Sequence, residues 1–354
     1  MRVAFYAPLK PPDHPTPSGD RRMARLLMEA LRAGGHVPVL ASRFRSRDAT
    51  GSLIEAIKAR GAALAKQCLA RLRKNPPDAW LTYHLYYKAP DWIGPPVARA
   101  LGIPYLVAEA SWAPKRAVGP FAEGHRAVSD ALAAAAAVLA LSRLDMECLE
   151  AVTQRVVHFP PFLDARPFAV EHRANDVPQL LAVGMMRADA KLASYRILAE
   201  ALTRLADRRW RLRIVGDGPA RAEVEAAFAP LGDRVAFSGA APPEALPAIY
   251  AGADLLIWPA VDEAFGMALL EAQAAGTPVV AGGYGGVPEV IDDGASGVVT
   301  PPGDAVAFAH AIASLLDDPA RLAAMGVAAR LYIRAVHDLP DAARRLDAIL
   351  RNAR

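Results

Sequence analysis

The chain has 354 residues, of which 53% are hydrophobic and 22% are charged, and its formal net charge at pH 7 is +4. This composition excludes a disordered chain, and the length suits about two domains of ~150 to 200 residues each. The two cysteines, Cys68 and Cys148, are too few for a disulfide framework or a zinc site, which favours a cytoplasmic compartment. We expect no secretory signal and no transmembrane helix, because the most apolar run, residues 131–141, is shorter than the ~18 to 20 residues that span a bilayer.

Short apolar runs alternate with amphipathic segments, which predicts parallel sheets with crossover helices. In the first half we expect strands at 2–7, 36–42, 79–84, 104–110 and 138–142, with helices at 20–35, 53–72 and 89–102. The pattern pauses at 158–168, HFPPFLDARPF, which we interpret as a linker between domains. It restarts with strand segments at 179–186, 211–218, 234–239, 255–260, 278–283 and 297–302, and helical segments at 192–205, 220–231, 246–253, 265–276 and 305–318.

The predicted fold class is therefore α/β, with two Rossmann-like, doubly wound parallel-sheet domains. We place the domains at residues 1–165 and 166–335, followed by a helix at 336–354 that packs back toward the N-terminal domain. Ligands of such sheets bind just outside the carboxyl ends of the strands. The carboxyl ends of the predicted strands are thus the places to search for functional residues.

A local basic surplus lies between Ala41 and Asn75, where nine Lys or Arg residues accompany two acids. It would attract an anionic membrane surface, to which each basic residue contributes ~1 kcal/mol, or an anionic acceptor. An ordinary solvated helix face is the alternative explanation. We expect no nucleic-acid partner, because the surplus is local and lacks interleaved stacking aromatics.

The segment IVGDGPA contains Gly216, Asp217 and Gly218 after a predicted strand and before a predicted helix. Glycines permit a tight turn with close backbone approach, and the helix start beyond them offers free N–H groups to an anion. The motif is weak alone, since any connection from strand to helix can use glycines and a capping Asp.

The segment EAFGMALLEA places Glu263 in a loop and Glu271 about one turn inside a helix that begins near Phe265, Gly266 and Met267. The unpaired N–H groups at such a helix start can bind a phosphate. A carboxylate within the helix can accept hydrogen bonds from a diol, such as a ribose. In the alternative reading Glu263 is a capping acid and Glu271 a solvated helix residue.

The segment 254–304 continues with an A-x-G-x-P-V-V-A step, a G-G-x-x-E loop and a final G-x-x-V-x-P-x-D. Together with the two glutamates, these motifs resemble the nucleotide-sugar-binding region of the retaining family 4 glycosyltransferases. The resemblance extends over nearly the whole chain and is most specific at 181–304. It implies a GT-B fold, in which two Rossmann-like domains face each other across a cleft and the second holds most of the donor.

The resemblance implies roles for individual residues of the second domain. Glu263 would lie near the donor sugar, the backbone of Phe265, Gly266 and Met267 near the diphosphate, and Glu271 on the ribose. Gly184, Gly216 and Asp217, with the segment 237–239, would line the donor. Relatives carry an Arg directly after the glycine that ends the first strand of this domain, whereas this chain has Met185 there. We assign phosphate binding to Lys191 and to the displaced Arg187, because the leaving diphosphate needs cations.

In the first domain the resemblance is weaker. Ser18 and Gly19 match the Gly-rich loop that would lie across the cleft from the donor phosphates. His84, at the end of a predicted strand, matches a frequent His of the acceptor site, although a lone His is more often a packed or capping residue. Glu109 stands where relatives often have a His.

The sequence therefore predicts a retaining glycosyltransferase that moves a hexose from a nucleoside diphosphate sugar to a sugar or lipid-linked hydroxyl acceptor. We expect no cofactor and no metal, since neither a metal-ligand cluster nor an Asp-x-Asp motif is present. The expected setting is cell-surface polysaccharide or glycolipid assembly, at the cytoplasmic face of the membrane. The alternatives are a nucleotide-sugar epimerase on the same fold and a degenerate nucleotide-sugar-binding subunit.

Overall fold

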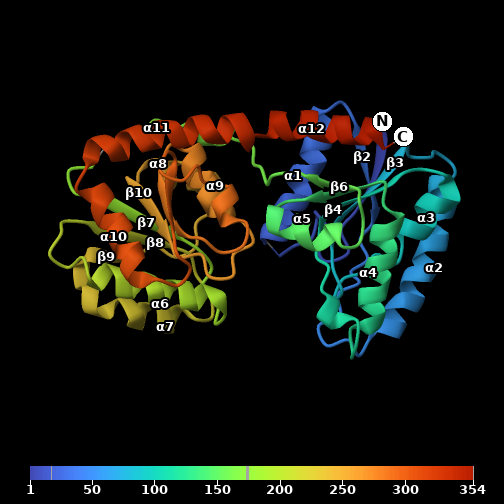
Figure 1. Cartoon of the computed structure of the whole chain (residues 1–354), viewed down its shortest axis with the longest axis horizontal. Helices are drawn as coiled ribbons and strands as arrows, with labels where there is room; N and C mark the ends of the chain where they lie inside the picture. The colour runs from blue at the N-terminus through green and yellow to red at the C-terminus, as the bar shows by residue number, and fades with distance from the viewer. Residues whose placement is uncertain (17, 173–174, 354) are drawn as a thin grey trace. The chain divides into compact units, whose positions relative to one another are not determined.

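The computed structural model describes residues 1–16, 18–172 and 175–353. The chain forms two compact units, one made of Met1–Pro160 with Leu339–Arg354 and the other of Pro161–Asp338. The predicted boundaries lay at 165 and 335, a few residues from the observed ones. Figure 1 colours the chain from its N-terminus to its C-terminus and labels the elements of each unit.

The first unit is built on a six-stranded parallel sheet with the strand order β2-β1-β3-β4-β5-β6. Its strands are β1 (Arg2–Tyr6), β2 (Val37–Ser42), β3 (Ala79–Leu85), β4 (Tyr105–Ala110), β5 (Ala137–Ala140) and β6 (Val156–His158). Its helices are α1 (Gly19–Ala33), α2 (Ile54–Leu72), α3 (Gly94–Leu101), α4 (Ala122–Ala134), α5 (Arg143–Glu150) and α12 (Leu339–Asn352). Helices α2 and α3 pack side by side, as Figure 1 shows.

The second unit contains another six-stranded parallel sheet, with the order β12-β11-β10-β7-β8-β9. Its strands are β7 (Gln179–Val183), β8 (Arg211–Val215), β9 (Val235–Phe237), β10 (Leu255–Trp258), β11 (Val279–Gly282) and β12 (Gly297–Thr300). Its helices are α6 (Ala190–Thr203), α7 (Arg221–Phe228), α8 (Leu246–Ala251), α9 (Met267–Ala274), α10 (Ala305–Leu316) and α11 (Pro319–Val336). The apolar strands β10 and β11 are buried over their whole length, as expected where helices cover both faces of a parallel sheet.

The predicted α/β class with two doubly wound parallel sheets is confirmed. In each sheet the chain starts in the middle and builds outward in both directions, so the order reverses between two neighbouring strands. These switch points lie between β1 and β3 in the first sheet and between β7 and β10 in the second. Ligands of doubly wound sheets bind at the carboxyl ends of such strands.

Several elements differ from the sequence prediction. Helices α4 and α5 and strand β6 were not predicted, although they complete the first sheet. The helix expected at 89–102 begins at Gly94, because the buried Asp91 carboxylate accepts hydrogen bonds from Ile93 N and Gly94 N and so caps the first turn.

The chain passes between the units twice, near Pro161 and near Asp338. Within the second unit the two passages are hydrogen-bonded to each other: Leu163 N donates to His337 O at 3.0 Å, and Ala165 N donates to Asp338 Oδ1 at 3.1 Å. Within the first unit the final helix, α12, packs against α1, and Asp347 on α12 lies 3.1 Å from His36 Nε2.

Candidate functional site

The switch point of the second sheet brings together Lys191 and Glu263. Lys191 lies in the first turn of α6, which follows β7, and Glu263 lies in the loop between β10 and α9. The Lys191 ammonium forms an ion pair with Glu263 Oε2. The two side chains are 17% and 20% exposed, so the pair is mostly shielded from water yet still reachable from it. Both residues were predicted, and the structure brings them into direct contact.

The loop that presents Glu263 has a strained backbone. Ala260 and Asp262 adopt positive φ angles of 57° and 49°, a region that costs a non-glycine residue of order 1–3 kcal/mol. The loop is held by hydrogen bonds from Glu263 N to Ala260 O and from Val261 N to the buried Ser194 Oγ on α6. Strain of this kind persists where surrounding contacts hold the backbone in one conformation. Here those contacts fix the position of Glu263.

The glycines around the site are required for close contacts between loops. A Cβ on Gly216 would lie 1.8 Å from Gly184 O, and one on Gly282 would lie 2.2 Å from Pro259 O. Gly285 has a φ of +51°, and a Cβ there would lie 2.5 Å from Glu263 O. The glycine-rich loops after β8 and β11 therefore pack directly on the loops after β7 and β10. The sequence predicts that a ligand can come close to the backbone of these glycines. The structure shows that the backbone of neighbouring loops also lies close to them.

Helix α9 begins at Met267 with Gly266 as its N-cap, at φ 76° and ψ 84°. Because the cap is a glycine, it contributes no capping side chain to the N–H groups of the first turn. Phe265, just before the cap, is half-buried against the core of the unit. No side chain of the cap residue therefore occupies this helix start, and the binding of an anionic ligand there stays a prediction.

Glu271 lies in the second turn of α9 and is 3% exposed. Its Oε2 accepts a hydrogen bond of 2.7 Å from Tyr250 Oη. The alternative reading, in which Glu271 is a solvated helix residue, is therefore wrong. A buried carboxylate is costly unless it is hydrogen-bonded, and the Tyr250 hydroxyl supplies such a bond here.

Arg187 and Asp217, which were also predicted to bind the donor substrate, have exposed side chains. Arg187 Nε forms an ion pair with Asp189 Oδ2 at 3.1 Å, with both side chains about half exposed. The structure does not bring Arg187 into contact with Lys191 or Glu263. The Asp217 carboxylate accepts a hydrogen bond of 2.8 Å from Gly218 N and lies 3.7 Å from Arg221.

The carboxyl edge of the first sheet gathers His84, Glu109 and Asp20. The register pairs Tyr83 with Ala108 and Leu85 with Ala110, so His84 and Glu109 lie opposite each other on β3 and β4. Both have positive φ angles, 61° and 57°. His84 Nδ1 lies 3.2 Å from Asp20 Oδ1 and 3.3 Å from Glu109 Oε1. Asp20 follows the predicted residues Ser18 and Gly19 at the start of α1.

In this cluster a partly buried imidazole, that of His84, lies between the carboxylates of Asp20 and Glu109. Burial lowers the pKa of His84, but the charges of Glu109 and Asp20 outweigh it, so the pKa is raised from 6.5. Burial raises the pKa of Glu109 despite the neighbouring His84. Burial also opposes ionisation of Asp20, yet His84 and Lys10 keep the pKa of that carboxyl below its usual value. The two carboxylates therefore favour the protonated form of the imidazole.

Ser18 is the N-cap of α1, and its Oγ accepts a hydrogen bond of 3.2 Å from Arg21 N. The neighbouring Gly19 is exposed, and a Cβ added there would meet nothing within 4 Å. Packing within the protein therefore does not require a glycine at this position.

Sequence reasoning missed two aromatic residues of the second site. Trp258 ends β10, and its Nε1 donates to Glu263 Oε2 at 3.3 Å. Tyr250 on α8 donates to Glu271. A tryptophan at the carboxyl end of a strand, directly before Pro259, was a usable signal for Trp258, whereas the sequence holds no signal that pairs Tyr250 with Glu271.

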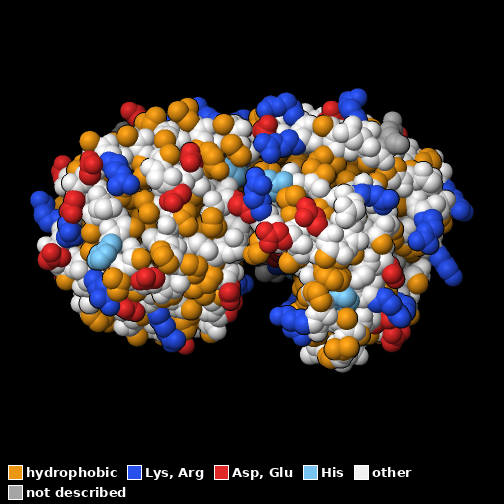
Figure 2. Space-filling view, in the orientation of Figure 1, with side chains coloured by type: hydrophobic (Ala, Val, Ile, Leu, Met, Phe, Trp, Pro, Cys, Tyr) orange, Lys and Arg blue, Asp and Glu red, His pale blue; other side chains and the backbone are white. Residues whose placement is uncertain are grey.

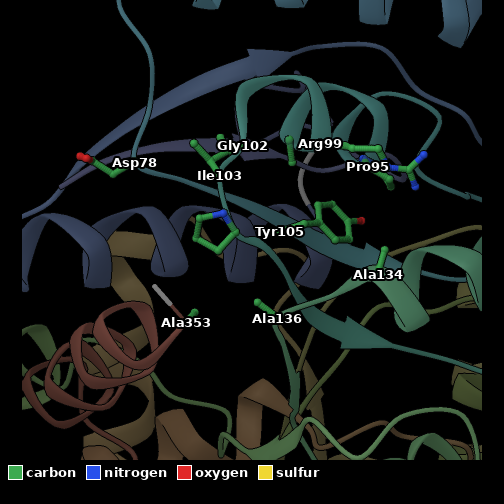
Figure 3. A pocket seen from close by; sticks show the side chains of 11 residues that line it. Asp78, Pro95, Arg99, Gly102, Ile103, Tyr105, Ala134, Ala136 and Ala353 are labelled. Carbon is green, nitrogen blue, oxygen red and sulfur yellow. The ribbon is translucent and has the colours of Figure 1, made fainter.

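Two cavities lined by described residues lie at the other edge of each sheet, beside the amino ends of the strands. One cavity, in the first unit, has a volume of about 600 Å³. Figure 3 shows residues that line it, among them Asp78, Ile103, Tyr105 and Ala136, which precede or begin β3, β4 and β5. A second, of about 580 Å³, lies in the other unit between Pro178, Pro278 and α11. Both adjoin the amino ends of the strands, where doubly wound sheets do not bind their substrates.

Helix α2 carries much of the predicted basic tract. Arg60, Lys66, Arg71, Arg73 and Lys74 are exposed on or just after it. Figure 2 shows basic side chains along the edge of the unit where Figure 1 labels α2 and α3. Among the described residues, no helix is both long and apolar enough to cross a bilayer, and no group of three or more His, Cys, Asp or Glu side chains is arranged to hold a metal ion.

Comparisons with known proteins agree with this architecture. The family described as glycosyl transferases group 1 matches residues 177–318. The 2-deoxystreptamine glucosyltransferase of Streptomyces kanamyceticus is 32% identical over 288 residues, which cover 73% of each chain. A GDP-mannose-dependent phosphatidylinositol monomannoside mannosyltransferase of Mycolicibacterium smegmatis is 36% identical over 193 residues, covering 49% of this chain and 50% of the relative.

Solved structures show the same fold. Sucrose-phosphate synthase of Thermosynechococcus elongatus aligns with a TM-score of 0.77 at 22% identity, over 99% of this chain and 98% of that one. HepE of Anabaena, solved in complex with UDP-glucose, aligns with a TM-score of 0.72 at 18% identity, over 99% of both chains. The two doubly wound domains are thus those of a GT-B protein. The chain belongs to the group 1 glycosyl transferases, and the predicted family is confirmed.

Proposed function

We propose that this glycosyltransferase moves a hexose from a nucleoside diphosphate sugar to a hydroxyl acceptor with retention of anomeric configuration and without a metal. The observation that carries the proposal is the contact between Lys191 and Glu263 beside the open start of α9, at the switch point of the second sheet. A cation and a helix N-terminus together suit a diphosphate.

In this proposal the charge that gathers on the leaving β-phosphate is stabilised by Lys191, Arg187 and the first-turn N–H groups of α9. Glu263 binds hydroxyls of the transferred sugar. Glu271 binds the ribose from the second turn of α9. The printed names of two similar proteins, one solved with UDP-glucose and one dependent on GDP-mannose, support a nucleoside diphosphate sugar as donor.

Retention is best explained by transfer on one face of the sugar. A double displacement needs a carboxylate nucleophile beside the anomeric carbon, whereas in this proposal Glu263 binds the other hydroxyls of the sugar. We infer that the leaving phosphate takes the proton of the acceptor hydroxyl. In this proposal His84 orients that hydroxyl from its place between Asp20 and Glu109.

The test is donor turnover with UDP-glucose and GDP-mannose, with and without EDTA, in the native protein and in Glu263→Gln. Release of UDP or GDP that persists in EDTA and falls in the variant supports the proposal. An NMR assignment of the product anomer decides retention. Binding without release from either donor points to a degenerate binding subunit, and release of an isomerised nucleotide sugar points to an epimerase.

For the acceptor, we propose a sugar or lipid-linked hydroxyl compound of cell-surface polysaccharide or glycolipid assembly, with α2 in contact with an anionic membrane. Exposed basic residues on α2 support the contact. Co-sedimentation with phosphatidylglycerol vesicles, lost with phosphatidylcholine and weakened by Lys66→Glu and Arg73→Glu, is the expected result. Equal recovery of the native protein and the variants with both kinds of vesicle would contradict the membrane contact.

A second acceptor class has a specific observation in its favour. Asp20, Glu109 and Asp145 all act electrostatically on His84, so the acidic cluster would also suit an acceptor that carries an ammonium group. A relative similar over 73% of its length acts, by its printed name, on the diamine 2-deoxystreptamine. Comparing 2-deoxystreptamine with the neutral cyclitol myo-inositol as acceptors separates the two classes.

A further inference from the structure

We propose that Trp258 is a positioning residue of the donor site, which orients the Glu263 carboxylate with its indole N–H and supports the Lys191 ammonium on its ring. The inference rests on the proposed function, because it gives Trp258 a task within that donor site. It adds a residue that no motif of the sequence indicated.

Trp258 contacts both members of the ion pair. Its Nε1 lies 3.3 Å from Glu263 Oε2, the same oxygen that pairs with Lys191. The Lys191 Nζ lies 5.3 Å from the centroid of the indole ring, within the distance at which a cation is attracted to an aromatic face. The side chain is 2% exposed, and a buried indole N–H normally requires an acceptor.

These contacts leave the two oxygens of Glu263 in different states. Oε2 accepts from both Lys191 and Trp258, whereas no hydrogen bond to Oε1 is formed by the residues that the structure describes. One oxygen is thus held by the protein while the other remains for a substrate hydroxyl. Without the indole N–H, Lys191 alone would orient the carboxylate, and Lys191 is also the proposed ligand of the donor phosphate.

The indole is itself held in place by the loop after β7. The ring of Tyr195 packs edge-on against it at 5.0 Å between centroids, and Tyr195 Oη donates to Gly184 O at 2.8 Å. A Cβ on Gly184 would lie 3.1 Å from the indole ring. Trp258 therefore connects the loops on both sides of the switch point.

A purely space-filling tryptophan is the alternative, and Trp210 provides a matched control. Trp210 is equally buried in the same unit, and its Nε1 donates to Leu205 O at 2.8 Å, away from Lys191 and Glu263. Trp258→Phe and Trp210→Phe each remove one buried indole N–H and keep an aromatic ring. Only the first touches the ion pair.

The experiment measures kcat and donor KM with UDP-glucose or GDP-mannose, whichever the native protein turns over, and uses melting temperatures to verify folding. Trp258→Phe should lower kcat about 10-fold with KM within about 2-fold, the size expected for one hydrogen bond to a charged group that acts in the transition state. Trp258→Leu, which also removes the ring beneath Lys191, should raise KM as well. Trp210→Phe should leave both constants near the native values.

A double-mutant cycle shows whether Trp258 acts through Glu263. In a Glu263→Ala background, Trp258→Phe should change kcat less than about 2-fold, because the group that it orients is gone. A kcat for Trp258→Phe equal to that of Trp210→Phe, or an undiminished effect in the Glu263→Ala background, would overturn the inference while leaving the proposed function intact. Absence of turnover with every donor in the native protein would overturn both.

Discussion

Lys191 and Glu263 form an ion pair that joins the loop after β7 to the loop after β10, the two strands between which the order of the second sheet reverses. The lysine reaches the contact from the first turn of α6, and the glutamate reaches it from a loop with two residues at positive φ. Each side chain thus has a counter-charge before any donor binds. Binding of a diphosphate would exchange the partner of the lysine.

Because Lys191 would bind the diphosphate and Glu263 the sugar, substitutions at the two residues should have different effects. Lys191→Met should weaken binding of a nucleoside diphosphate by about 10- to 100-fold, because a charge-assisted contact to phosphate contributes about 1.5–3 kcal/mol. Glu263→Gln should mainly reduce kcat, since its partner is the reacting sugar. Calorimetric titration with UDP and GDP measures the first effect, and steady-state kinetics measures the second. Lys66→Met, on exposed α2, is the control. Equal and negligible effects of both variants would contradict the assignment.

Glu271 and Tyr250 form a buried pair, and substitutions at the two residues should affect different properties of the protein. Glu271→Ala should weaken nucleotide binding, since it removes the proposed ribose ligand. Tyr250→Phe leaves the buried carboxylate short of one donor and should lower the free energy of unfolding by about 1–3 kcal/mol. Urea unfolding of the variants measures this loss. A Glu271→Ala protein that binds nucleotide with native affinity would exclude the ribose role.

The glycines of the site should tolerate substitution poorly. Gly216→Ala places a methyl group 1.8 Å from Gly184 O at a φ of +152°, so the loops after β7 and β8 must separate. Gly102→Ala is the control, because Gly102 also has a positive φ, +65°, but meets nothing within 4 Å. The control should lose only about 1 kcal/mol, the usual cost of the left-handed backbone. Denaturant unfolding that gives Gly216→Ala no greater loss would contradict the close packing of the loops.

The pKa of His84 should fall when Glu109 loses its charge. Burial lowers this pKa, and Glu109 is the largest influence that raises it. In Glu109→Gln the NMR titration of the His84 ring should therefore shift toward lower pH. In the native protein the raised pKa stabilises the fold below pH 6.5, and this contribution is lost as the pH rises through the folded-state pKa. An unchanged titration midpoint in the variant would mean that Glu109 does not control the imidazole.

Much of the second unit could be predicted from the sequence. Strands such as 255–260 and 278–283 are short apolar runs bounded by Pro and Gly, and buried parallel strands have that signature. Glu263 and the start of α9 were predicted because they follow such a strand, whereas Lys191 was assigned from the resemblance to the family. In the first unit, α4 was missed because its alanine-rich end runs without a break into the apolar β5, so no turn residue separates helix from strand.

The remaining features depend on contacts between residues distant in sequence. The burial of Glu271 follows from the packing of α8 and α9, and the pairing of His84 with Glu109 follows from the register of β3 and β4. The place of Trp258 at the end of its strand was a usable signal, but its contact with Lys191 depends on how α6 packs against β10. The motif from which we assigned Arg187 to the donor phosphates likewise does not indicate its exposed ion pair with Asp189.

The central claim is that the second unit binds a nucleoside diphosphate sugar through Glu271 and the start of α9. Its most direct test is a thermal-shift panel of UDP-, GDP-, ADP- and TDP-sugars on the native protein and on Glu271→Ala. A ligand at 100 times its dissociation constant adds about 2.7 kcal/mol to the folded state. We expect one nucleotide to raise the melting temperature of the native protein and to lose that effect in the variant. No shift with any nucleotide, or an equal shift in both proteins, would contradict the claim.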